Sequence, residues 1–85
     1  MDPLVITPTT TIEDILLYAM QEEEFAAAFY RKAACRTADP HVKAFLLQMA
    51  TKEDEHYQEL RKKLEEMEAD HFSVLGVQES FDSQY

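Results

Sequence analysis

Helix-breaking residues are almost absent from the interior of this chain, and this absence limits the folds that it can adopt. Its 85 residues include one glycine and three prolines, which stand at Pro3, Pro8, Pro40 and Gly76. The long stretches between them carry few turn signals and no alternating runs of valine, isoleucine and threonine. The sequence therefore predicts an all-α fold built from a small number of long helices.

Apolar residues recur at spacings of three and four on both sides of Pro40, which is typical of two amphipathic helices. The first helix is predicted over about residues 11–37. Several threonines could cap its start, and Thr10 followed by Glu13 fits a capping box. Asp39 and Pro40 then form a helix-start signal, because aspartate caps well and proline fits the first helical position.

The second helix is predicted to end near Ala69, with a continuation to a C-cap at Gly76 as the alternative. The chain then divides into three parts. Residues 1–10 form a flexible leader and residues 11–70 form a helical hairpin. Residues 71–85 form a C-terminal tail, either as a short helix or as a docking peptide.

The short connection makes the two helices antiparallel neighbours, and such a hairpin can bury only one shared seam. Large apolar side chains are left beside that seam, namely Leu17, Phe25, Phe29, Phe45 and Tyr57. A core this small usually needs a disulfide, a metal or a partner subunit. Cys35 is the only cysteine, which excludes an internal disulfide. The hairpin is therefore predicted to dimerise into a four-helix bundle.

The charge balance excludes some classes of partner. The chain has 17 acidic and 8 basic side chains, which argues against nucleic acid and is compatible either with attracting cations or with a soluble acidic surface. No apolar run approaches the roughly 20 residues of a membrane span. The start at Met1 lacks the basic region of a signal peptide, and a lone thiol suits a reducing compartment, so a cytoplasmic protein is expected.

Charged residues interrupt the predicted apolar stripes. The first stripe reads Ile12, Leu16, Ala19, Glu23, Ala26, Tyr30 and Ala33, and the second reads Val42, Leu46, Met49, Glu53, His56, Leu60, Leu64 and Met67. Ionised carboxylates inside a stripe are expected to be paired or to bind a metal, because burying them alone costs several kcal/mol.

The spacing of these residues fits a metal site. Glu53 and His56 are three residues apart and share a helix face. Glu23 lies 16 residues before Asp39, and the pair lies 14 to 17 residues after it, so an antiparallel hairpin brings all three to one level. Carboxylate oxygen with imidazole nitrogen suits iron, manganese or zinc better than calcium. The alternative is a partly hydrated polar seam in which Glu23 pairs with a lysine or with His56.

One chain supplies only half of a ligand set. A two-fold dimer would supply four glutamates and two histidines, which is the inventory of ferritin-like di-iron bundles.

Two segments resemble the ligand helices of rubrerythrins and other ferritin-like proteins. In residues 22–34 a glutamate, Glu23, precedes Tyr30 by seven positions, and residues 38–45 followed by 53–56 resemble the second helix with its Glu-x-x-His. The likeness covers about residues 12–68. Rubrerythrins carry two such helix pairs, often with the Cys-x-x-Cys pairs of a rubredoxin domain, and this chain has one pair of helices and no Cys-x-x-Cys. The closer resemblance is to encapsulated ferritins, whose two-helix subunits build the site between chains.

This resemblance implies a ferroxidase with an iron cofactor, in which Glu23, Glu53 and His56 of two subunits hold a di-iron site. It places Tyr30 behind the ligands as a hydrogen-bond partner of a carboxylate, and Glu22 on the dimer surface where iron enters. The alternatives are a core aromatic for Tyr30 and a solvated helix face for Glu22.

The resemblance also implies larger ring-like homo-oligomers, and iron storage inside an encapsulin nanocompartment reached through a C-terminal peptide. Residues 73–77 are loosely similar to such peptides, and a helix C-cap explains them equally well. Two other functions stay open, a rubrerythrin-like peroxide reductase and a metal-free or zinc-bound helical adaptor.

Overall fold

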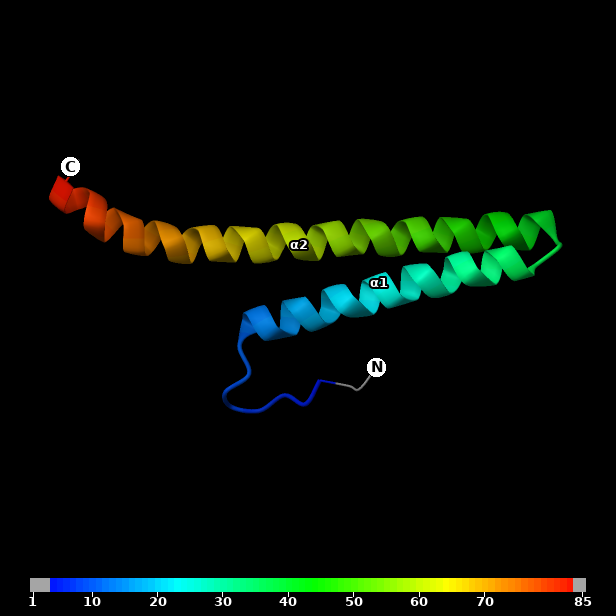
Figure 1. Cartoon of the computed structure of the whole chain (residues 1–85), viewed down its shortest axis with the longest axis horizontal. Coiled ribbons are helices and arrows are strands. Elements are labelled where there is room, and N and C mark those ends of the chain that lie inside the picture. Colours follow the sequence, from blue (N-terminus) through cyan, green and yellow to red (C-terminus); the bar gives the residue numbers. More distant parts are fainter. Residues whose placement is uncertain (1–3, 84–85) are drawn as a thin grey trace.

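The computed structural model describes the backbone of residues 4–83 and the side chains of residues 4–70. It contains two helices, α1 (Ile12–Arg36) and α2 (Pro40–Ser83). They lie side by side and antiparallel, and residues 4–11 form a non-helical leader that turns back beneath α1 (Figure 1). No strand occurs within residues 4–83, and the predicted all-α hairpin is confirmed.

The capping box of α1 lies one residue later than predicted. The hydroxyl of Thr11 accepts a hydrogen bond from the Asp14 amide at 3.0 Å, and the Asp14 carboxylate accepts one from the Thr11 amide at 3.0 Å. The predicted box of Thr10 and Glu13 is wrong because Thr10 is already engaged. Its hydroxyl accepts from the Thr7 amide at 2.8 Å, which closes a turn ahead of the helix.

The start of α2 agrees with its sequence signal. The Asp39 carboxylate accepts hydrogen bonds from the backbone amides of His41 at 2.8 Å and Val42 at 3.3 Å, as expected for an N-cap. Thr37 has an extended backbone and ends α1, so residues 37–39 alone connect the helices. This short connection fixes which residues of α1 and α2 lie level with one another.

The far end of α2 differs from the prediction. The helix continues through Ala69 to Ser83, and no glycine within residues 4–83 has a positive φ, so Gly76 does not cap it. Because α2 has 44 residues and α1 has 25, its C-terminal part extends past the start of α1 (Figure 1).

The core of the hairpin is narrow. The buried residues among those described are Met20, Ala27, Ala34, Ala50 and Leu64. Three of them are alanines, which allow the two helix backbones to approach closely. The α1 interface thus contains Met20, Ala27 and Ala34 in place of Ala19, Ala26 and Ala33 of the predicted stripe, which are only half-buried.

Large apolar side chains remain in solvent outside this seam, as predicted for Leu17, Phe25, Phe29 and Phe45. Tyr57 is the exception, because it is half-buried in the seam. None of the described helices has the length and hydropathy needed to cross a membrane.

Candidate metal centre

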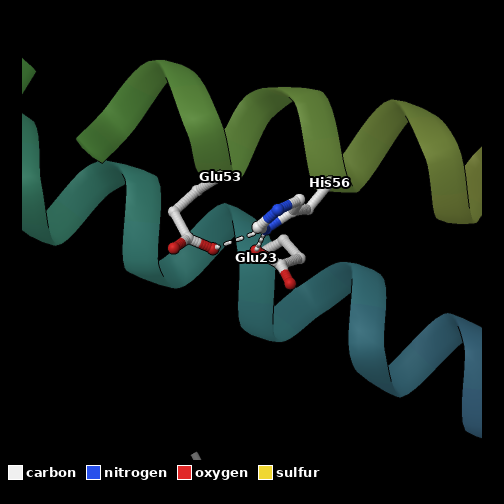
Figure 2. A group of neighbouring side chains, drawn as sticks. All are labelled: Glu23, Glu53 and His56. Atoms are coloured by element: carbon white, nitrogen blue, oxygen red, sulfur yellow. Dashed lines mark ion pairs between the residues drawn. The ribbon is translucent and has the colours of Figure 1, made fainter. Parts of the chain in front are cut away.

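Three potential metal ligands converge near the middle of the hairpin. Glu23 projects from α1, and Glu53 and His56 project from α2 towards it (Figure 2). One ligand atom from each residue lies within 4.8 Å of the other two. Counting residues from the helix connection predicted that the three side chains lie at the same height along the hairpin, and the structure shows this.

The three side chains differ in burial. The side chains of Glu23 and Glu53 are 22% and 17% exposed, whereas His56 is 54% exposed. The glutamates belong to the seam, since Glu23 lies between the buried Met20 and Ala27 along α1. His56 instead lies on one flank of the seam, because Tyr57 occupies the inward position next to it. The group therefore opens towards the flank that carries His56.

The polar atoms of the group are close but do not satisfy one another. The Nδ1 atom of His56 is 3.6 Å from Oε2 of Glu23 and 3.8 Å from Oε2 of Glu53, and both distances exceed that of a hydrogen bond. Oε2 of Glu23 is buried and has no hydrogen-bond partner. Buried polar atoms are nearly always paired, so this oxygen requires an explanation.

A metal ion fits the donor set of this group. Two carboxylates and one imidazole are the ligand types that iron, manganese and zinc share, and an ion would satisfy the unpaired oxygen of Glu23. The alternative with a lysine is not supported, because His56 is the only basic residue in an ion pair with Glu23 or Glu53 among the described side chains.

A second cross-hairpin contact was not anticipated from the sequence. Arg31 of α1 forms an ion pair with Asp54 of α2, in which the two terminal guanidinium nitrogens donate to the two carboxylate oxygens. Asp54 directly follows Glu53 and lies on the flank opposite His56. The sequence did place a basic residue beside one predicted stripe and an acidic residue beside the other. Such a pair is hard to assign from spacing alone, because a long arginine side chain can reach several acidic residues.

The two accessory residues lie outside the three-residue group. Glu22 is exposed on α1 and contacts Tyr18. The pKa of Tyr18 is raised, first by partial burial of the phenol and then by the Glu22 carboxylate. A backbone hydrogen bond involving Leu4 lowers the pKa but does not cancel the rise. Tyr30 is half-buried, and its ring packs edge-on against Phe29 with the centroids 5.5 Å apart. The iron-entrance role of Glu22 and the carboxylate contact of Tyr30 stay predictions.

Comparison with known proteins adds one match. A family model described as Rubrerythrin matches residues 14–82. This span covers most of α1 and α2 and includes all three candidate ligands. No curated protein and no solved structure matches the chain.

Proposed function

The chain belongs to the rubrerythrin family of the ferritin-like superfamily, and on this basis we propose that it oxidises Fe(II) at a di-iron site shared by two subunits. The observation that carries the proposal is the group of Glu23, Glu53 and His56, with its buried and unpaired carboxylate oxygen. Family membership favours iron over the other metals that suit these donors.

A second subunit would complete the site. One chain offers two carboxylates and one imidazole, and a two-fold copy doubles them to the ligand set of a di-iron bundle. The flank that carries His56 also holds Met49 and Leu60, which are half-buried, and the exposed Phe45. These residues follow one another at helical spacing with His56, so a partner that covers the site would cover an apolar surface as well.

The side chains have distinct roles in this proposal. Glu23 and Glu53 would neutralise the charge of bound iron and His56 would add a neutral nitrogen ligand. Bound iron supplies one-electron redox chemistry. The balanced reaction converts two Fe(II) ions, dioxygen and two protons into two Fe(III) ions and hydrogen peroxide. Tyr30 would orient a ligand carboxylate by a hydrogen bond, and Glu22 would attract incoming Fe(II) at the surface.

We extend the proposal to the setting of the protein. A dimer of two-helix subunits encloses no space for a mineral, so an iron-storage role would need a host shell such as an encapsulin nanocompartment. The segment proposed to contact that shell, residues 73–77, lies in α2, and its side chains are outside the described residues.

A peroxide reductase of the rubrerythrin type is the second candidate, because the matching family model is that of rubrerythrins. Both candidates use the same ligands and differ in the oxidant. Stopped-flow oxidation of Fe(II)-loaded protein with dioxygen and with hydrogen peroxide separates them. A much faster reaction with peroxide would favour the reductase.

The test of the site is an anaerobic Fe(II) titration of metal-free protein, followed by admission of air. We expect a near-ultraviolet ferric band that is lost in Glu53→Ala and in His56→Ala. Glu55→Ala is the matched control, since Glu55 lies between the two ligands and is exposed. Absence of the band in the wild type, or its persistence in both ligand variants, would refute the proposed function.

A further inference from the structure

α1 carries a second row of residues with the spacing of a helix interface. The row that faces α2 comprises Leu16, Met20, Glu23, Ala27, Tyr30 and Ala34, separated by four, three, four, three and four positions. The same spacing recurs two positions later, in the row Tyr18, Glu22, Phe25, Phe29, Lys32 and Arg36. We refer to this second row as the outer seam.

The outer seam points away from α2. Two residues turn an α-helix by about 200°, so each member lies nearly opposite the corresponding member of the inner row. Phe25 and Phe29 are accordingly 62% and 61% exposed. The leader reaches the outer seam at Tyr18, and in Figure 1 α2 lies on the other side of α1. The hairpin thus leaves two aromatic rings in solvent on a face with coiled-coil periodicity.

Shallow grooves accompany these rings. One groove is lined by Phe25, Ala28, Phe29 and Lys32, and the next by Phe29, Lys32, Ala33 and Arg36. Protruding side chains beside grooves of the same helix are the elements of knobs-into-holes packing. A second helix with the same surface could therefore insert its own rings into these grooves.

We propose that the outer seam binds the outer seam of a second copy of this chain, antiparallel and about a two-fold axis at the level of Ala27. This arrangement places Phe25 opposite Phe29 of the second copy. It also places Glu22 opposite Lys32 of the second copy. Each contact occurs twice, as in any two-fold interface.

The order of charges selects both the partner and the direction. The outer seam has an acidic member, Glu22, before its aromatic centre and basic members, Lys32 and Arg36, after it. A parallel pair would place like charges opposite each other, which is unfavourable, whereas the antiparallel pair matches opposite charges. Because the outer seam matches its own charges when a second copy runs in the opposite direction, a second copy of this chain fits it.

This interface differs from the one that completes the metal site. The metal site opens on the flank of the hairpin that carries His56, and the outer seam lies on the side of α1 turned away from α2. The inference goes beyond the proposed function, because the outer seam contains none of the three ligands and shares with that function only Glu22, the proposed iron entrance. It requires no metal.

Carbodiimide cross-linking of the full-length, metal-free protein tests the contact directly. Within one helix Glu22 and Lys32 are ten residues apart, about 15 Å, which is too far for a zero-length bond. A Glu22–Lys32 cross-linked peptide can therefore form only between chains. We expect this peptide in mass spectrometry of the dimer band, and its absence from a dimer that does form would overturn the antiparallel pairing.

Charge reversal tests the same contact thermodynamically. We expect Glu22→Lys or Lys32→Glu alone to weaken metal-free dimerisation about tenfold or more by sedimentation, since two like-charge contacts replace two favourable ones. The double variant Glu22→Lys/Lys32→Glu should restore association to within about threefold of the wild type. Failure of this rescue, or a monomeric wild type at concentrations that give ordered helix, would overturn the proposal.

Truncation tests the aromatic centre. Phe29→Ala should weaken association, whereas Leu47→Ala should not, because Leu47 is an exposed apolar residue on α2 outside the outer seam. Equal effects of the two variants would overturn the assignment to α1. The ferric band in the Fe(II) experiment measures the metal site separately. Phe29→Ala and Lys32→Glu change neither a proposed ligand nor the proposed iron entrance at Glu22, so with these variants failure of one proposal is distinguishable from failure of the other.

Discussion

Replacing Glu23 by leucine should stabilise the metal-free protein and destabilise the metal-loaded protein. Oε2 of Glu23 is buried without a hydrogen-bond partner, and its nearest basic group, Nδ1 of His56, is 3.6 Å away. Leucine has a similar volume and suits the neighbouring Met20 and Ala27. The substitution thus removes an unsatisfied polar group where an apolar one can pack, and it also removes a proposed ligand.

The two effects can be given magnitudes. An unsatisfied buried polar group costs about 1–3 kcal/mol. The Glu23 side chain is still 22% exposed, so we expect a gain at the lower end, about 1 kcal/mol, without metal. A ligand at 100 times its dissociation constant stabilises the protein that binds it by about 2.7 kcal/mol. With metal the variant should therefore be about 2 kcal/mol less stable than the wild type, since it loses this contribution.

The assay is urea unfolding followed by circular dichroism, at one fixed protomer concentration, with chelator and then with Zn(II) as a redox-silent ion. Glu24→Leu is the matched control, because Glu24 is the adjacent glutamate and is exposed. It should change stability little and should keep the stabilisation by metal. The reasoning is refuted if Glu23→Leu destabilises the metal-free protein, or if Zn(II) stabilises this variant as much as the wild type.

Three further predictions concern other parts of the chain. Thr11→Ala should lower stability by about 1 kcal/mol in thermal unfolding, and Thr11→Ser should not, because serine keeps the capping hydroxyl. The Arg31–Asp54 pair has half-exposed side chains, so a double-mutant cycle with Arg31→Ala and Asp54→Ala should give a coupling of only about 0.2–1 kcal/mol. The raised pKa of Tyr18 means that the folded state keeps the phenolic proton to higher pH than the unfolded state, whose value is near 10.0. This contribution to stability is complete below that pH and is lost as pH rises above it. Tyr18→Phe should remove this part of the alkaline pH dependence of the unfolding free energy, and an unchanged pH profile would contradict the assignment.

The fold could be predicted because strong local signals agreed with the helical period. The Asp39–Pro40 start signal and the scarcity of glycine fixed two helices and their antiparallel order. The exact face of α1 was harder, because residues 26–28 are all alanine and residues 33 and 34 are alanine as well. Two sets of inward-facing residues, one position apart, are then equally apolar. Only the packing of Ala27 and Ala34 against α2 distinguishes the correct set.

The candidate site could be predicted because its geometry follows from counting. A three-residue connection fixes the level of Glu23 relative to Glu53 and His56, and an error of one residue in the count changes that level by only about 1.5 Å. The exposure of His56 could not be foreseen in the same way. It depends on whether residue 56 or Tyr57 points inward, and both types of side chain occur in such seams.

Electrostatics gives the two proposed interfaces different dependences on metal. Dimerisation over the site would bring four carboxylates together with only the two His56 side chains beside them, which is unfavourable until cations neutralise the charge. The outer seam instead pairs Glu22 with Lys32 and needs no ion. If both interfaces form, the metal-free protein pairs through α1 first, and Fe(II) then closes the site face. Iron would in this way control assembly as well as undergo oxidation, and the mass of the protein in solution should increase in a second step when metal is added.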